Sequence, residues 1–289
     1  MNSRGSQSRI DLHVHSTASD GTLSPAEVVR AAAQAGLDVV ALTDHDTLDG
    51  WQEACSACPA GLSVIPGLEL SCVYTAGQER PISVHLLGYL VDPADPQLRA
   101  ELARLQGERR RRGERMVQKL VAAGFPITWQ RVLEFADGGS VGRPHIGRAL
   151  LEAEVVSSVD EAFAELLSAA GPYYVGKADL DAIAGVGLIR AAGGVAVFAH
   201  PAAGRRGRVV DAAAIGVLAE TGLAGIEVDH PDHLPSDRET LRALAARLGL
   251  VPTGSSDFHG TNKANRLGEC TTSPSAYREL MAMASGSSP

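Results

Sequence analysis

DLHVH at residues 11–15 is the stretch of sequence that decides the fold. It lies at the start of the chain in a short apolar run, residues 10–14, with the composition of a β-strand. His13 and His15 are two residues apart, and side chains at that spacing on a strand point to the same side. The run therefore predicts two imidazole ligands for one metal ion, with Asp11 close enough to orient them.

Further apolar runs alternate with helical patterns along the chain. They lie at residues 38–43, 62–66, 82–90, 194–199, 225–229 and 250–254. Nearly continuous apolar strands are typical of parallel sheets that are covered on both faces, and helices expected at 209–221 and 236–248 fit βα units. After the first strand, Ser24 can cap a helix, Pro25 suits its first position and Glu27 completes a capping box. The pattern predicts an α/β barrel.

Acidic or histidine side chains occur within or just after each of the seven expected strands. They are Asp11, His13, His15, Asp20, Asp44, His45, Asp46, Glu69, His85, His200, Glu227, His230, Asp257 and His259. In a βα barrel the C-terminal ends of the strands converge on one face, where such enzymes hold their active sites. A single histidine is more often structural, and Asp44 and Asp46 can instead cap a helix, but chance would scatter such residues. We therefore predict one metal site at this face.

The ligand types indicate the chemistry of that site. Imidazole and carboxylate without cysteine suit zinc, manganese or iron, and so many ligands can hold more than one ion. Ions about 3.5–4 Å apart can clamp a phosphate group and activate a bridging water for in-line attack on phosphorus.

The alternation of strands and helices stops between residues 92 and 192. Helices are expected there at residues 96–123, 128–136, 141–151, 159–169 and 180–192. A helical insertion at 92–192, within a barrel formed by residues 10–91 and 193–285, explains this more simply than a separate terminal domain. Its first helix carries a basic stretch at residues 109–112, which is either a solvated face or a track for an oligonucleotide.

Composition excludes several other classes of protein. The chain of 289 residues has 26 basic and 34 acidic side chains, a net charge of −8, and 45% apolar residues. Such a chain is globular and does not bind nucleic acid by bulk charge. No apolar run reaches the roughly 18 residues of a membrane span, and four cysteines are too few for a disulfide scaffold. We expect a cytoplasmic protein with no membrane association and no evident protein partner.

The polar segments, taken in order, resemble the PHP (polymerase and histidinol phosphatase) family of metal-dependent phosphoesterases. The matching pieces are DLHVHS at 11–16, SDG at 19–21, LTDHD at 42–46, GLE at 67–69, AHP at 199–201, GIEV at 225–228 and GSSDFH at 254–259. The resemblance implies a distorted (β/α)7 barrel with two or three divalent ions, manganese first, with zinc, iron and magnesium as alternatives.

The resemblance also implies how the ligands divide among the ions. One ion would take His13, His15, Glu69 and Asp257; a second would take Asp20, His45 and His259; a third would take Glu69, His85 and His200.

Within the family, the helical insertion resembles the stand-alone branch that acts on nucleotides. Relatives there convert nucleoside 3′,5′-bisphosphates to nucleoside 5′-monophosphates and inorganic phosphate, and some trim short RNAs from the 5′ end. The expected substrate is therefore a nucleotide or short oligonucleotide phosphate ester.

Residues of the insertion are candidates for contacts with that substrate. The segment GRPHIGR at 142–148 resembles an Arg-x-His element of the branch. Arg143 can present a bidentate fork to phosphate, and His145 can bind phosphate or donate a proton to the leaving oxygen. Each also has a local alternative, namely an ion pair for Arg143 and a packing or capping role for His145. His233 follows the GIEV segment as a third candidate for a substrate contact, while His230 lies outside the match. Asp11 and His145 are the predicted catalytic residues besides the ligands.

Three alternatives stay open at this point. The first is a histidinol phosphatase. The second is a metal-dependent binding module without catalysis, which the complete set of ligand positions disfavours. The third is an amidohydrolase, which is weaker because that chemistry often uses a carboxylated barrel lysine and no expected strand offers a lysine.

Overall fold

A mixed β-sheet forms the centre of the computed structural model, which describes residues 8–168, 171–176 and 179–285. Its strand order is β1-β2-β3-β4-β6-β7-β8. The strands are β1 (Ile10–Val14), β2 (Val39–Leu42), β3 (Ser63–Tyr74), β4 (Ile82–Tyr89), β6 (Val195–Ala199), β7 (Gly225–Asp229) and β8 (Val251–Gly254). The two-residue β5 (Leu180–Asp181) pairs with β3 outside this path.

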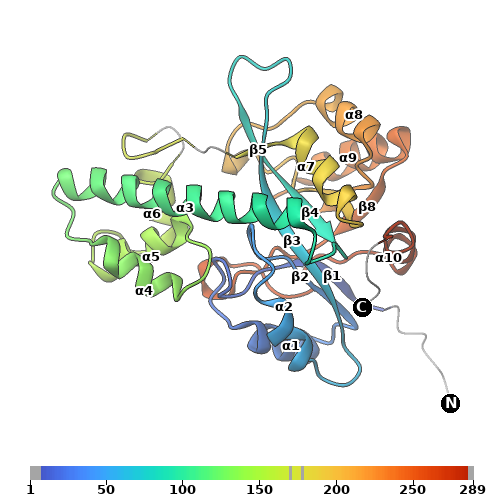
Figure 1. Cartoon of the computed structure of the whole chain (residues 1–289), viewed down its shortest axis with the longest axis horizontal. Helices are drawn as coiled ribbons and strands as arrows, with labels where there is room; N and C mark the ends of the chain where they lie inside the picture. The colour runs from blue at the N-terminus through green and yellow to red at the C-terminus, as the bar shows by residue number, and fades with distance from the viewer. Residues whose placement is uncertain (1–7, 169–170, 177–178, 286–289) are drawn as a thin grey trace.

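The two edge strands of the sheet approach each other. Val14 of β1 forms a parallel bridge with Phe258 after β8, and Ile10 forms an antiparallel bridge with Thr272. The sheet is thus a nearly closed barrel, which confirms the predicted distorted seven-stranded architecture (Figure 1).

One strand runs against the expectation of a parallel sheet. β4 is antiparallel to both neighbours, with His85 opposite Ser71 of β3 and Ala199 of β6. Since Ala199 is the last residue of β6, the beginning of β4 lies at the face where the parallel strands end. β3 is also longer than the predicted 62–66, so Glu69 lies inside that strand rather than after it.

Helices cover the outside of the barrel. They are α1 (Pro25–Gln34), α2 (Trp51–Ser56), α7 (Ala182–Ala191), α8 (Ala212–Thr221), α9 (Pro235–Leu248) and α10 (Pro274–Met281). The predicted capping box of α1 is present, with Ser24 accepting from the Glu27 amide and Glu27 accepting from the Ser24 amide. The helix predicted at 180–192 begins two residues later, because Leu180 and Asp181 form β5 and the Asp181 side chain caps α7.

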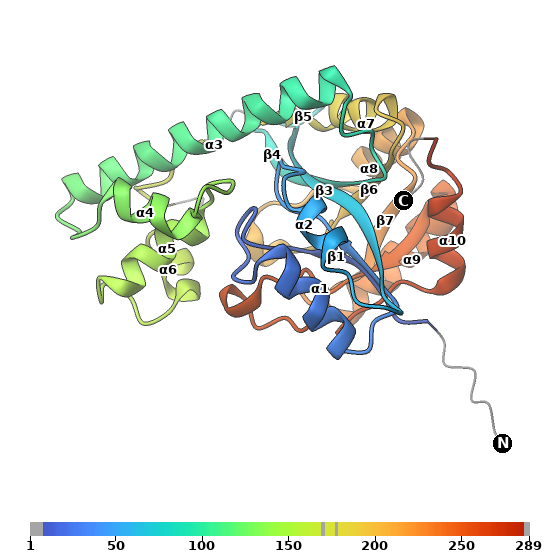
Figure 2. The same ribbon diagram turned by 60° about the horizontal axis from the view of Figure 1, so that its bottom comes forward.

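The described part of residues 92–192 contains four helices besides α7, and one of them contributes to two hydrophobic cores. They are α3 (Pro96–Ala122), α4 (Trp129–Ala136), α5 (Arg143–Glu152) and α6 (Val159–Glu165). The first half of α3 packs Leu98 and Leu105 into the barrel core. Its second half packs Met116 and Leu120 into a separate core with Ile146 of α5. Figure 2 shows α3 reaching from the barrel to the group α4–α6, which we call the cap. Residue 169, the predicted end of α6, lies outside the described residues.

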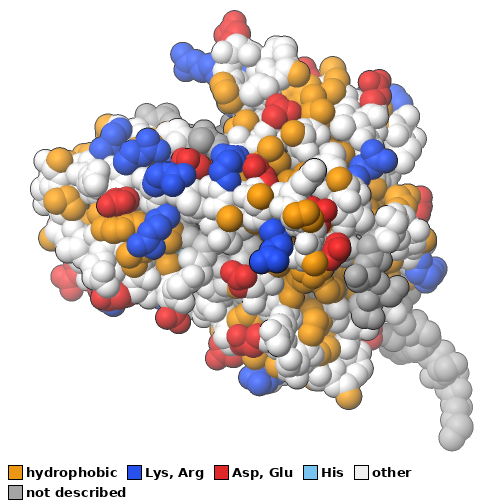
Figure 3. Space-filling view, viewed as in Figure 1, with side chains coloured by type: hydrophobic (Ala, Val, Ile, Leu, Met, Phe, Trp, Pro, Cys, Tyr) orange, Lys and Arg blue, Asp and Glu red, His pale blue; other side chains and the backbone are white. Residues whose placement is uncertain are grey.

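The basic stretch of α3 divides between surface and interior. Arg110, Arg111 and Arg115 are exposed, whereas Arg112 is buried. Figure 3 shows Lys and Arg side chains along α3 with acidic side chains among them, and Arg111 pairs with Glu108 one turn earlier. In the part of the chain that is described, no helix is long and apolar enough to cross a membrane.

Candidate metal centre

Four side chains converge at the face where the parallel strands end. His13 and His15 come from β1 and the residue after it, Glu69 from β3, and Asp257 from the loop after β8. The two Nε2 atoms of the histidines lie 3.0 Å apart. Glu69 Oε2 lies 3.3 Å and 3.1 Å from them, and Asp257 Oδ1 lies 3.4 Å and 3.5 Å away. All four side chains are buried, so the first predicted ligand set surrounds one point.

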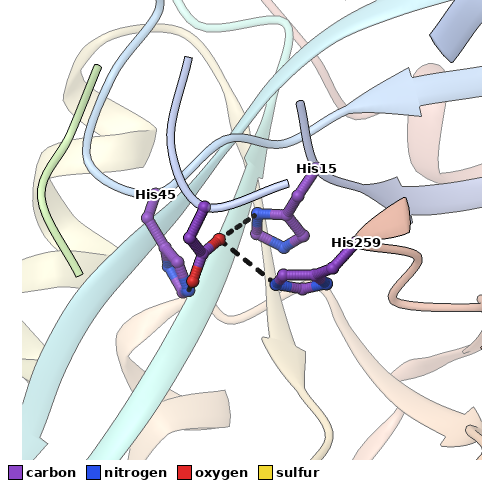
Figure 4. Close-up of side chains that lie close together, drawn as sticks. His15, His45 and His259 are labelled. Atoms are coloured by element: carbon purple, nitrogen blue, oxygen red, sulfur yellow. Dashed lines mark ion pairs between the residues drawn. The ribbon is translucent and has the colours of Figure 1, made fainter. Parts of the chain in front are cut away.

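A second group shares His15. Figure 4 shows His15, His45 and His259 pointing toward one another, and Asp20 lies among them. Asp20 Oδ1 is 3.2 Å from His259 Nε2 and 3.7 Å from His15 Nδ1, and Asp20 Oδ2 is 3.8 Å from His45 Nε2. The second predicted set is therefore also assembled, with His15 as an additional member.

The third group is built on the other oxygen of Glu69. Glu69 Oε1 lies 2.7 Å from His85 Nδ1 and 2.9 Å from His200 Nε2. His45 reaches the same carboxylate, with Nδ1 3.1 Å from Oε2. Glu69 thus connects all three groups. His85 reaches this point because β4 is antiparallel, which places its first half at this face.

The donor atoms fit divalent metal ions. His45 Nδ1 and Asp257 Oδ1 are buried and have no hydrogen-bond partner in the described part of the chain. Buried polar atoms without partners are costly, and both atoms face the groups described above. Nitrogen and oxygen donors without cysteine sulfur suit zinc, manganese and iron.

The histidines of the site differ in protonation. Burial opposes it, but the neighbouring carboxylates raise the pKa of His13 well above its usual value and that of His15 to about 9, so a metal ion would have to displace these protons. Burial lowers the pKa of His200 to about 3 and of His259 to about 4, with Arg206 and His15 adding to the respective shifts. These imidazoles are neutral at pH 7, the form that coordinates a metal. Burial alone would raise the pKa of Asp20, but the neighbouring His259 and His45 outweigh it and hold the pKa well below the usual value. Asp20 is therefore ionised.

Strained backbone supports the geometry of the site. Asp46, His200 and Asp257 have φ angles of 56°, 31° and 52°, in the left-handed region that non-glycine residues rarely adopt. Such strain persists only where the surrounding structure holds it, and it concentrates at functional sites. Two of these strained residues, His200 and Asp257, supply side chains to the ligand groups described above.

Comparison with known proteins identifies the family. The family model of the PHP domain matches residues 11–173. The chain belongs to the PHP family. It is accordingly a metal-dependent phosphoesterase, a hydrolase.

Three relatives are similar to this chain over most of its length. A 3′,5′-nucleoside bisphosphate phosphatase of Chromobacterium violaceum is 34% identical over 89% of this chain and 89% of its own length. The 5′-3′ exoribonuclease Rnm of Salmonella typhimurium is 31% identical over 86% of this chain and 84% of its own. A phosphoribosyl 1,2-cyclic phosphate 1,2-diphosphodiesterase of Eggerthella lenta is 34% identical over 86% and 94%.

A solved structure agrees with the family assignment. A metal-dependent phosphoesterase from Bifidobacterium adolescentis is 36% identical, covers 96% of both chains and superposes with a TM-score of 0.91.

Two further carboxylates of this PHP site, Asp11 and Glu227, hydrogen-bond to the candidate ligand residues or to the loops that carry them. Asp11 Oδ1 accepts from the Ser256 amide at 3.0 Å and Oδ2 accepts from the Gly268 amide at 2.8 Å, so Asp11 holds the loop that carries Asp257. Glu227 Oε1 lies 3.1 Å from His13 Nδ1, and Oε2 accepts from the His200 amide at 2.7 Å. The ligand assignment from sequence missed this role of Glu227, although its place at the end of a strand beside the other site residues was a usable signal.

His145 lies in the first turn of α5 and is buried. Its Nδ1 accepts from the Gly142 amide at 3.0 Å. Burial lowers the pKa of His145 to about 4, although nearby Asp20 opposes the shift. His145 is thus neutral at pH 7 in this structure, and its role as a proton donor to the leaving oxygen stays a prediction.

The other two residues predicted to contact the substrate differ in how many of their polar atoms are already hydrogen-bonded within the protein. Arg143 donates to the Leu167 carbonyl at 2.9 Å and packs over Phe163. His233 uses both ring nitrogens on the backbone, since Nδ1 donates to the Val228 carbonyl at 2.9 Å and Nε2 accepts from the Ala202 amide at 3.2 Å. This geometry favours a structural role for His233, and its contact with substrate stays a prediction.

Proposed function

We propose that this PHP phosphoesterase removes the 3′-phosphate from nucleoside 3′,5′-bisphosphates, giving nucleoside 5′-monophosphate and inorganic phosphate. A second proposed activity is the release of nucleotides from the 5′ end of short oligoribonucleotides. The observation that carries the proposal is the meeting of three ligand groups on Glu69, beside a cap that supplies Arg143. Relatives named for nucleotide and RNA substrates support the choice of substrate.

Two or three divalent ions, with manganese as the first choice, are the proposed cofactors. Their ligands would be His13, His15, Glu69 and Asp257 for one ion, Asp20, His45 and His259 for another, and Glu69, His85 and His200 for a third. When bound, such ions would offset the charge of the phosphate oxygens and lower the pKa of the attacking water.

The chain's own residues orient the reactants. In the proposed hydrolysis, a bond forms between a water oxygen and phosphorus while the bond from phosphorus to the 3′ oxygen breaks. One water proton ends on that 3′ oxygen, and the other stays with the phosphate or passes to solvent. Asp11 and Glu227 are positioning residues, because they touch the Asp257 loop and His13. His145, being neutral, would serve as a hydrogen-bond partner for the phosphate.

Two further expectations stay proposals. Residues 92–192 would act as one insertion that selects the substrate, while residues 10–91 and 193–285 carry the metal centre. The chain would work in the cytoplasm, in keeping with its small number of cysteines.

A panel of phosphate esters tests the substrate. Purified protein with manganese would be given adenosine 3′,5′-bisphosphate, a 5′-phosphorylated trinucleotide, a ribose 1,2-cyclic phosphate and histidinol phosphate, and released phosphate and nucleotides would be measured. The proposal expects the highest kcat/KM with the bisphosphate. Hydrolysis of histidinol phosphate without hydrolysis of the nucleotides would instead establish the alternative of a histidinol phosphatase. A metal-loaded protein inactive on the whole panel would favour a binding module.

A further inference from the structure

The loop that joins α4 to α5 in the cap, residues 137–142, lies against the segment that follows β1. We call these the cap loop and, for residues 16–21, the Asp20 segment. The Ser140 amide donates a hydrogen bond to the Ala18 carbonyl at 2.9 Å. A Cβ added to Gly142 would lie 3.7 Å from the Asp20 carboxylate. The cap, which Figure 2 shows beside the barrel, therefore touches the segment that carries a candidate metal ligand.

Gly139 allows the two backbones to approach closely. A Cβ added to this glycine would lie 2.5 Å from the Thr17 carbonyl oxygen and 2.9 Å from the Ala18 carbonyl oxygen. Both neighbours are backbone atoms, which cannot rotate away as the end of a side chain can. The φ of Gly139 lies outside the left-handed region, so the position needs a residue without a side chain rather than an unusual backbone angle.

The barrel holds the opposite side of the Asp20 segment. Asn262 lies in η2 (Gly260–Asn262), and its Nδ2 donates to the Asp20 carbonyl at 2.7 Å. The Ser19 hydroxyl donates to Asp44 Oδ1, also at 2.7 Å. The side chains of Asn262, Ser19 and Asp44 are buried. The Asp20 segment is thus held between the cap on one side and the barrel on the other.

The position of Asp20 decides whether the second ligand group can hold an ion. A carboxylate oxygen binds metals such as zinc at about 2.0–2.2 Å, and such distances tolerate changes of only about 0.2 Å. A Cβ at Gly139 would have to move from 2.5 Å to at least 3.0 Å from the Thr17 carbonyl oxygen. The separation that this requires is larger than the tolerance of a metal–ligand distance.

We propose that Gly139 and Ser140 of the cap are positioning residues for Asp20. The docked cap loop holds Asp20 in its ligand group, so the ion of that group binds tightly only while the cap is docked. The inference rests on the proposed function, because it takes this group as a metal site, and it adds that the insertion acts on the metal centre as well as on the substrate. By thermodynamic reciprocity, the ion also strengthens the docking of the cap.

A manganese titration of the chelated protein tests this coupling, with free manganese measured by electron paramagnetic resonance. In Gly139→Ala the Kd of one ion should rise at least ~10-fold, while the other ions change less than ~2-fold. Asp20→Asn should weaken the same ion. Addition of Gly139→Ala to Asp20→Asn should then cause no further loss, because both changes act on one site.

The matched control is Gly187→Ala in the middle of α7. A Cβ at Gly187 would lie in open space among the residues that the structure describes, and its φ is also outside the left-handed region. Its Kd values should equal those of the wild type. Circular dichroism and thermal melting would show whether each variant is folded. Unchanged Kd values in folded Gly139→Ala, or an equal weakening of every ion, would overturn the inference.

Hydrogen exchange of the wild type gives a test that needs no substitution in the cap. Manganese should slow the exchange of the cap loop, where the Ser140 amide is bonded to Ala18, by at least ~5-fold. Mass spectrometry of peptides from the cap loop would measure it, with peptides from α6 of the same cap as the control. The effect should be absent in Asp20→Asn. Exchange of the cap loop that is independent of manganese would contradict the coupling.

Neither measurement requires hydrolysis, so this inference and the proposed function can fail separately. Coupling between the cap loop and one manganese ion, together with no hydrolysis of any nucleotide, would refute only the proposed reaction. Nucleotide hydrolysis with no coupling would refute only the inference. A wild type that binds no manganese would refute both.

Discussion

Glu69 is the residue on which the metal centre depends most. Its Oε2 faces His13, His15 and His45, and its Oε1 faces His85 and His200. Because one carboxylate serves three groups, the loss of its charge affects more than one ion.

Glu69→Gln should therefore lose at least two bound metal ions per chain and at least ~100-fold in kcat. The amide keeps the size of the side chain but has one oxygen and no charge. Plasma emission spectrometry after gel filtration would give the metal content. Glu108→Gln, at the surface of α3, serves as the matched control, and full metal content in Glu69→Gln would contradict the assignment.

The sequence allowed the ligand residues to be predicted one by one, because each follows or lies within an apolar run. The sequence did not reveal which other residues and which backbone conformations hold these ligands in place. The contact of Glu227 with His13 joins residues far apart in the chain, and the left-handed backbone of Asp257 has no local sequence signal, so neither could be predicted from the local pattern.

His233→Ala should destabilise the fold more than it affects substrate binding. The change removes two buried hydrogen bonds, to the Val228 carbonyl and the Ala202 amide, and we expect a loss of about 2 kcal/mol in the free energy of unfolding. Urea titration would measure it. Unchanged stability combined with a raised KM for the nucleotide would instead establish His233 as a substrate contact.

At the scale of elements, local signals predicted the start of α1 correctly. The Ser24 and Glu27 side chains satisfy each other's backbone amides, as the capping-box pattern requires.

Ser24→Ala should lower the free energy of unfolding by about 1 kcal/mol, because the Glu27 amide loses its acceptor. Chemical denaturation of wild type and variant would measure the difference. Ser24→Asp, which restores an acceptor, should recover most of it, and equal stability of Ser24→Ala and wild type would count against the cap.

Strand direction was the main error at this scale. The segment between β3 and β4, residues 75–81, is too short for the crossover that parallel strands need, but the expected strand ended at residue 66 and left room for one, so the antiparallel pairing follows only from the full length of β3. The pairing of β5 with β3 was not readable, since a two-residue strand leaves no periodic pattern. The boundaries of the insertion at residues 92 and 192 stay a prediction.

For the whole molecule, the net charge of −8 does not exclude an anionic substrate. Three divalent ions would reduce it to −2 and concentrate positive charge at the site.

Removal of these ions should weaken the fold, because ions that bind only the folded chain stabilise it. Dialysis against a chelator should lower Tm by several degrees, and added manganese should restore it. Differential scanning calorimetry would follow the change. A Tm independent of metal would mean that the buried groups are stable without ions.

The most direct test of the central claim is a manganese titration of the chelated protein, with phosphate release from adenosine 3′,5′-bisphosphate as the readout. We predict no release without metal, a rise that saturates at two or three equivalents of manganese per chain, and no rise in Glu69→Gln. Full activity in the chelated protein, or equal activation of wild type and Glu69→Gln, would contradict a metal-dependent phosphoesterase built on this site.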